Sequence, residues 1–208
     1  MENQIVQNTI PAMVEGLPKP HRCPWLVQYF LASPLRRILE PPEKVLGPFV
    51  KTGMTVVEPG CGFGYVSLSL SKMVGPEGRV ISVDLEPRAA ARLQQRAGKK
   101  GLADRMDIRT CESHDLGLGC YEGQADLVVV IHTLHEFEDI PGFLAQAARL
   151  LKPSGRMLVV EPRGHVTPEQ FTAELECCRL AGFKELDTPE LGGKRMAALL
   201  APPETREQ

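Results

Sequence analysis

The stretch with the clearest chemical meaning is a glycine-rich loop, Glu58-Pro59-Gly60-Cys61-Gly62-Phe63-Gly64. Apolar residues precede it and a segment of helical periodicity follows it, so the loop is expected to join a strand to a helix. Glycines let the chain reverse tightly and let the backbone approach a ligand, and the N–H groups that open the helix favour an anion. The loop therefore predicts a ligand site, with a tight turn that binds nothing as the alternative.

The spacing of these glycines limits which anion fits. They follow a Gly-x-Gly-x-Gly pattern, and Tyr65 stands where the dinucleotide fingerprint has its third glycine. A pyrophosphate needs a longer cradle, whereas the carboxylate of an amino acid is smaller and needs fewer amides. The spacing therefore argues against an NAD-linked oxidoreductase.

A second candidate binding residue is Asp84, which ends the apolar run that begins at Val80, twenty residues after Gly64. A carboxylate at the end of the second strand can accept both hydroxyls of an adenosine ribose. An acid there can equally serve as a favourable charge at a helix N-terminus.

The elements that position these residues have the pattern of an α/β fold, because short apolar runs alternate with helical segments from residue 54 onward. We expect a Rossmann-like, doubly wound, mostly parallel seven-stranded sheet with helices on both faces and a C-terminal antiparallel hairpin. The expected strands are 54–58, 79–84, 105–110, 125–131, 156–161, 183–187 and 194–200. The expected helices are 65–73, 87–100, 141–151 and one that begins after Thr167, with Gln170 at its third position, and stops at Gly182.

Composition bounds the class of protein. The chain has 208 residues and a net charge of −2 with scattered basic residues, so it has no positive stripe of the kind that nucleic acid binding requires. The longest apolar run is far shorter than the ~20 residues that cross a bilayer, and the first residues lack the features of a secretory signal. We therefore expect a cytoplasmic protein with no nucleic acid or membrane partner. A homodimer is a candidate assembly.

From about Pro42 to Leu200 the chain resembles the class I S-adenosylmethionine (SAM)-dependent methyltransferases. The glycine loop resembles their first motif, and the run from Asp126 to Glu136 resembles their fourth. Within that family the chain is similar to the small-molecule group that includes the ubiquinone and arsenite methylating enzymes. It has neither the Asn-Pro-Pro-Tyr run of enzymes that methylate base nitrogens nor the Pro-Cys that follows strand four in enzymes that attack pyrimidines.

The resemblance implies SAM as the cofactor and a domain at 42–201, with an N-terminal lid or substrate segment at 1–41 and a disordered tail at 202–208. It also implies a set of cofactor-binding residues from the carboxyl ends of the first four strands. This set is Glu58, Gly60, Gly62, Gly64, Asp84, Leu85, Glu112, Ser113, Ile131 and His132.

Methyl transfer needs an acceptor held in line with the methyl group, and a base is needed only if the acceptor must lose a proton. His135 and Glu136, after the fourth strand, are the candidate bases, although both can simply form the turn. Glu161, after the fifth strand, can face the acceptor or cap its own turn. Trp25 and Tyr29 lie on a predicted amphipathic helix that can close over the acceptor or pack permanently on the core.

Six cysteines occur without a Cys-x-x-Cys pair, and we interpret them as buried or inert thiols, with no metal site. The adjacent residues Cys177 and Cys178 can be interpreted as a metalloid site. However, side chains of neighbouring residues on a helix point about 100° apart, which does not favour a shared ligand. The stretch Phe171, Leu175 and Cys178 is more simply a buried stripe. The sequence thus predicts methylation of a small molecule, with a catalytically inactive SAM sensor, or a subunit of a heteromeric methyltransferase, as the alternative.

Overall fold

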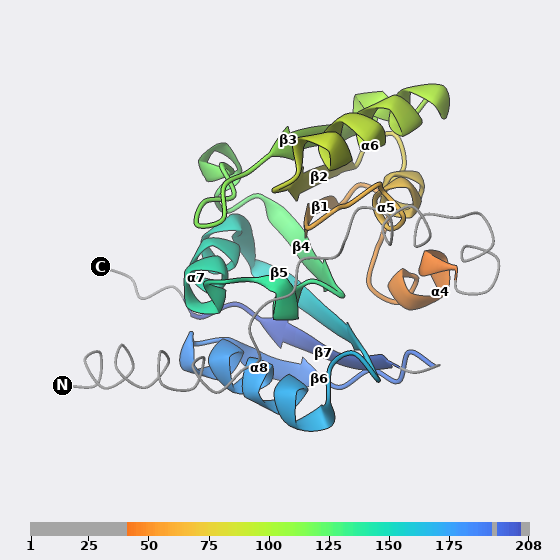
Figure 1. Ribbon diagram of the computed structural model, residues 1–208. Helices are drawn as coiled ribbons and strands as arrows, with labels where there is room; N and C mark the ends of the chain where they lie inside the picture. Colours follow the sequence, from red (N-terminus) through yellow and green to blue (C-terminus); the bar gives the residue numbers. More distant parts are fainter. Residues whose placement is uncertain (1–40, 193–194, 205–208) are drawn as a thin grey trace.

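The computed structural model describes residues 41–192 and 195–204, which form one seven-stranded sheet in the order β3-β2-β1-β4-β5-β7-β6 (Figure 1). Strands β1 to β5 are parallel to one another, and β7 runs antiparallel to both of its neighbours, β5 and β6. The strands are β1 Thr55–Pro59, β2 Arg79–Asp84, β3 Met106–Thr110, β4 Ala125–Ile131, β5 Leu151–Pro162, β6 Lys184–Asp187 and β7 Arg195–Ala201.

Five α-helices and three short 3-10 helices connect the strands in the described part of the chain. The α-helices are α4 Pro42–Leu46, α5 Ser67–Met73, α6 Pro87–Lys99, α7 Ile140–Leu150 and α8 Pro168–Leu180. The 3-10 helices are η1 Ala103–Arg105, η2 Gly119–Tyr121 and η3 Leu134–Glu136. None of the helices in these ranges is long and apolar enough to cross a membrane.

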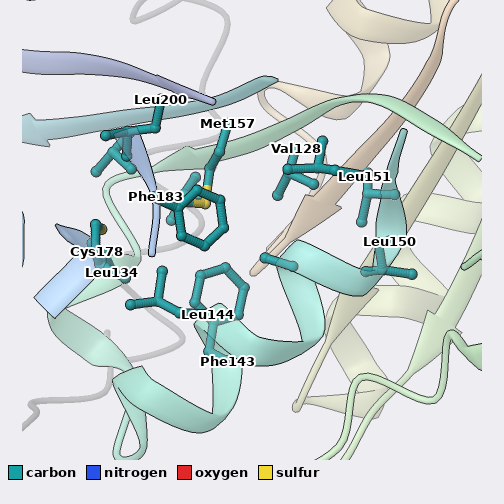
Figure 2. Close-up of a cluster of buried hydrophobic side chains, with 14 of the residues drawn as sticks. Val128, Leu134, Phe143, Leu144, Leu150, Leu151, Met157, Cys178, Phe183 and Leu200 are labelled. Atoms are coloured by element: carbon teal, nitrogen blue, oxygen red, sulfur yellow. The ribbon is translucent and has the colours of Figure 1, made fainter. Parts of the chain in front are cut away.

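Helices cover both faces of the sheet (Figure 1). On one face α7 and α8 pack on a large apolar cluster, and on the other α4 and α5 pack on a second cluster. Figure 2 shows the first cluster, in which Phe143 and Leu144 of α7, Cys178 of α8 and Met157 of β5 lie together. Because β1 to β5 are parallel, their carboxyl ends lie along one edge of the sheet, between the two layers of helices.

The sheet order reverses between β1 and β4, which are neighbours although their connections lead to opposite sides of the sheet. In an open α/β sheet, such a switch point leaves a crevice outside the carboxyl ends of the strands, where ligands bind. The residues at the ends of β1, β2, β3 and β4 therefore frame the expected site.

The predicted fold class, element order and C-terminal antiparallel pairing are confirmed. Strands 79–84 and 125–131 have the predicted bounds, and the other elements that were given bounds, apart from the fifth strand, shift by no more than two residues at either end. Helix α8 starts with the predicted capping box, in which the Thr167 hydroxyl accepts from the Gln170 N–H and the Gln170 side chain accepts from the Thr167 N–H.

The fifth strand is longer than predicted, because residues 152–155 do not form a separate turn between helix and strand. Strand β5 already pairs with β4 at Leu151, and the next paired position is Arg156 opposite Leu127. The Lys-Pro-x-Gly segment therefore bulges out of a continuous strand. Gly155 is required there because a Cβ would lie 2.8 Å from the carbonyl oxygen of Ala125.

The cysteines follow the prediction of buried thiols only in part. Cys61, Cys177 and Cys178 are buried, and all five described cysteines are free. Cys120 is exposed, because the turn that carries it lies on the surface at η2 rather than in a core element.

Candidate active site

A cavity of about 410 Å³ lies at the carboxyl edge of the sheet, over the switch point between β1 and β4. The ends of β1, β2 and β4 and the loop after β3 contribute to its wall, together with α4, the first two turns of α7 and Arg195 at the start of β7. The cavity is therefore built by segments far apart in the sequence that the parallel sheet brings to one edge.

The glycine loop forms one wall of this cavity. Gly60 and Gly62 have positive φ values of 73° and 50°, which favour glycine, and both line the cavity. A Cβ on Gly60 would lie 2.6 Å from the Thr133 Cγ2 atom, so the loop lies tightly against the segment after β4.

Gly64 has a different role, because it lies outside the cavity lining. Its φ is 79°, and a Cβ there would lie 2.2 Å from the Leu93 Cδ1 atom of α6. We therefore assign Gly64 to the close packing of the loop against α6, and we do not retain it as a direct ligand contact.

Asp84 lies at the end of β2 and faces the cavity. Its Oδ2 atom accepts from the Gly62 N–H at 2.7 Å, and its Oδ1 atom accepts from the Glu86 N–H at 2.9 Å. Burial raises the pKa of this carboxyl, and the two backbone hydrogen bonds oppose that shift. Asp84 thus fixes the shape of the glycine loop and presents a carboxylate beside it.

Glu58 is a buried acid at the end of β1, only 4% exposed. Its Oε2 atom accepts from the Ser82 hydroxyl at 2.8 Å. Burial raises the pKa of Glu58 to about 7, although the hydrogen bond from Ser82 favours the charged form. The side chain lines the cavity behind the glycine loop.

The remaining predicted cofactor residues also line the cavity. They are Leu85, Glu112, Ser113, Ile131 and His132. His132 is the one described non-glycine residue with a positive φ, at 58°, and its N–H donates to the Val160 carbonyl oxygen at 2.7 Å. A positive φ is disfavoured for a residue that has a Cβ atom. Non-glycine residues with a positive φ cluster at functional sites.

The two candidate bases point in different directions. Glu136 lines the cavity, whereas His135 does not. Burial raises the pKa of Glu136 to about 7; the charge on His135 opposes this shift, and the charges of Glu161 and Asp84 add to it. The cavity wall therefore presents a carboxyl whose pKa suits proton transfer near neutral pH.

His135 instead pairs with Glu161, which is fully buried at the end of β5. The His135 Nδ1 atom lies 2.8 Å from Glu161 Oε2, and the His135 N–H donates to Glu161 Oε1 at 3.3 Å. Burial lowers the pKa of His135, but the hydrogen bond and charge of Glu161 reverse this, so that the pKa is raised overall. Glu161 holds η3 in place and does not line the cavity.

Glu174 was not among the residues singled out from the sequence. It lies on the buried face of α8, 1% exposed. Burial, with the charge of Glu161, raises the pKa of Glu174 to about 8, and the charge of Glu174 contributes to the raised pKa of His135. The sequence contained a signal for its burial. Glu174 follows Phe171 by three residues and precedes Cys178 by four, so helical spacing places it inside an apolar stripe.

Other predicted site residues fall elsewhere. Trp25 and Tyr29 lie outside the described residues, so their role stays a prediction. Both Cys177 and Cys178 are buried in the core cluster under α8, as expected for packing residues. Within residues 41–192 and 195–204, no group of three or more His, Cys, Asp or Glu side chains is arranged to hold a metal ion.

Comparison with known proteins identifies the family that has this architecture. A family profile described as "Methyltransferase domain" matches residues 50–192. The demethylmenaquinone methyltransferase of Lactococcus lactis subsp. lactis (strain IL1403) is 30% identical over 114 residues, which cover 53% of this chain and 42% of that protein. The ribosomal protein L11 methyltransferase of Tolumonas auensis (strain DSM 9187 / NBRC 110442 / TA 4) is 28% identical over 145 residues, covering 64% of this chain and 46% of that protein.

The chain thus spans less than half the length of these two relatives. Among solved structures, that of a SAM-dependent methyltransferase from Aquifex aeolicus matches with a TM-score of 0.77 and 25% identity, covering 86% of this chain and 98% of that chain. The profile extends over more than half of the chain. The profile and this structural match both agree with the switch-point cavity and its glycine loop. The chain therefore belongs to the class I SAM-dependent methyltransferase family.

Proposed function

We propose that this chain transfers a methyl group from SAM to a small acceptor, with Glu136 as the base when the acceptor must lose a proton. The observation that carries the proposal is the shared cavity, in which the glycine loop, Asp84 and Glu136 face the same space. Family membership supports SAM as the cofactor.

The residues present fit SAM. The N–H groups of the glycine loop can hold its carboxylate, because the loop is short and its glycines leave the backbone open to the cavity. Asp84 can accept from the ribose hydroxyls through lone pairs that its two backbone bonds leave available. When bound, SAM supplies an electrophilic methyl group on a sulfonium sulfur.

The protein's own contribution to chemistry is to orient the acceptor and to take its proton. Glu136 reaches the cavity from η3, and η3 is anchored by the two contacts between His135 and the buried Glu161. A positioned carboxylate with a pKa near the working pH contributes about 10²- to 10⁴-fold to proton abstraction. Holding the acceptor in line supplies the rest of the acceleration.

A small acceptor is the finer part of the proposal. The volume of about 410 Å³ falls within the range of cavities that enclose small ligands. One similar protein is named for demethylmenaquinone and another for ribosomal protein L11, so names alone do not choose between a small molecule and a protein. A cytoplasmic location is also part of the proposal, and the free thiols at all five described cysteines fit a reducing compartment.

The test is a screen of small oxygen, nitrogen, sulfur and metalloid acceptors for formation of S-adenosylhomocysteine (SAH). Ribosomal protein L11 is included as a protein acceptor. We expect turnover with a small acceptor and a large loss in Glu136→Gln, while Glu176→Gln keeps the rate. Glu176 is a matched control because it is ion-paired with Arg179 on the outer part of α8 and does not line the cavity. Binding of SAM with no turnover on any acceptor would favour the inactive sensor or subunit.

A further inference from the structure

The loop after β3 borders the cavity with residues that are exposed. Residues 112–115 are all in this class, so burial of their side chains does little to hold the loop. Within it, the Glu112 N–H donates to the Asp115 carbonyl oxygen at 2.9 Å, and the Asp115 N–H donates to the Glu112 carbonyl oxygen at 3.3 Å. These two bonds close a turn, but they do not connect the turn to a neighbouring element.

Gln146 of α7 makes that connection. Its Oε1 atom accepts from the Leu116 N–H at 2.8 Å, and its Nε2 atom donates to the His114 carbonyl oxygen at 3.0 Å. The Nε2 atom also lies 3.4 Å from the Gly142 carbonyl oxygen of its own helix. The side-chain amide therefore binds the loop as a peptide group would, with one acceptor and one donor.

The position of Gln146 explains why hydrogen bonds hold the loop. Asp115, Leu116 and Gln146 line both the active-site cavity and a second cavity of about 160 Å³, so they form the partition between the two. Open space on both sides of a partition leaves less packing to support it. Helix α7 is itself anchored, because Phe143 and Ala147 are buried in the apolar cluster on that face of the sheet.

The order of the strands indicates which part of the cofactor meets this loop. Strand β2 lies between β1 and β3. The glycine loop follows β1, and Asp84 at the end of β2 accepts from the Gly62 N–H of that loop at 2.7 Å. A SAM molecule with its carboxylate at the glycine loop and its ribose at Asp84 therefore extends its adenine toward the segment after β3. Glu112 and Asp115 line the cavity there, and a carboxylate can accept from the adenine amino group.

We propose that Gln146 is a positioning residue for the adenine end of the cofactor and acts through residues 112–116. This inference rests on the proposed binding of SAM in this cavity. Both bonds from Gln146 are made to backbone atoms of the loop, so they set where the backbone carries Glu112 and Asp115. If the loop leaves this conformation, the apparent affinity for the cofactor falls with the fraction of molecules that retain it.

The experiment is titration calorimetry on the full chain with SAH and with S-inosylhomocysteine, in which a carbonyl oxygen replaces the adenine amino group. The wild type should prefer SAH, because carboxylates accept from an amino group and repel a carbonyl oxygen. Gln146→Met keeps the length of the side chain and removes both bonds to the loop. We expect it to weaken SAH binding about tenfold, the scale of one or two net hydrogen bonds, and to reduce the preference for SAH by a similar factor.

Two further variants separate positioning from a general loss of structure. Gln146→Glu keeps an acceptor for the Leu116 N–H and should restore part of the affinity and of the preference. Gln95→Met is the matched control, because Gln95 is an exposed glutamine on α6 that accepts from Arg92 at 2.7 Å and does not line the cavity. It should bind both ligands as the wild type does.

An unchanged SAH affinity in Gln146→Met would overturn the proposal. A loss of affinity that is equal for the two ligands would overturn it as well, as would a wild type that does not distinguish them. If Gln146→Met does not fold, hydrogen exchange of the Leu116 amide in the ligand-free wild type decides. Slow exchange is expected because this N–H donates to Gln146, and exchange at the rate of an unprotected amide would contradict the inference.

The outcomes also separate this inference from the proposed function. Binding of SAH with the expected preference, but no turnover on any acceptor, would refute methyl transfer and leave the role of Gln146 standing. No binding of SAH by the wild type would overturn both.

Discussion

Stability should fall as the pH rises through the neutral range, and Glu174 should account for a separable part of that fall. The folded-state pKa of Glu174 is raised from 4.5 to about 8 by burial. The folded protein therefore holds a proton that the unfolded chain has already released. Such a group contributes stability that is fully present below the unfolded pKa and is lost as the pH rises to the folded pKa.

The magnitude follows from the width of that interval. One proton held only in the folded state changes the free energy of unfolding by about 1.4 kcal/mol per pH unit. Between about pH 5.5 and about pH 8.5 this amounts to roughly 2–4 kcal/mol for Glu174. Glu58 and Glu136, each with a pKa raised to about 7, add a loss of the same sign.

Urea unfolding at a series of pH values measures this difference. The glutamine in Glu174→Gln cannot ionise, so the free energy of unfolding of this variant should fall less with pH than that of the wild type. The difference between the two falls should be roughly 2–4 kcal/mol between about pH 5.5 and about pH 8.5. Glu176→Gln should keep the wild-type slope, since hydrogen bonding and charge from Arg179 lower the pKa of Glu176 and its titration lies in the acid range. Parallel curves for the wild type and Glu174→Gln would refute the reasoning.

Three further predictions concern the cavity. Asp84→Ala should weaken SAH binding by about 1.5–3 kcal/mol, the range for hydrogen bonds to a charged group, and an unchanged dissociation constant by calorimetry would place the ribose elsewhere. Gly64→Ala should lower the free energy of unfolding by about 1–3 kcal/mol through its clash with Leu93, which an unaltered urea midpoint would contradict. Glu136→Gln should lower turnover about 10²- to 10⁴-fold with SAH affinity nearly intact, provided that the acceptor loses a proton; a wild-type rate would remove Glu136 as the base.

Local signals in the sequence were sufficient for much of the fold. The start of α8 could be predicted because the capping box of Thr167 and Gln170 involves only neighbouring residues. Strand 125–131 could be predicted because a buried parallel strand is a continuous apolar run. The bulge at residues 152–155 could not, because it depends on the register of β5 against β4.

The candidate site shows the same limit. The ligand-facing glycines and Asp84 are found from motif spacing, but the opposite orientations of His135 and Glu136 are set by Glu161, which lies 26 positions away from His135 on another strand. Likewise, Gly64 belongs to the motif, yet its neighbour Leu93 comes from α6 and assigns it to packing. Side-chain direction at the site depends on tertiary contacts that spacing along the chain does not contain.

The central claim is that the cavity at the carboxyl edge binds SAM through its short glycine loop. Titration calorimetry with SAM, SAH and NAD on the wild-type chain tests it most directly. The account predicts one site with micromolar affinity for SAM and SAH and little affinity for NAD, because the loop fits a carboxylate and lacks a pyrophosphate cradle. Binding of NAD that is comparable to or tighter than that of SAM would contradict it.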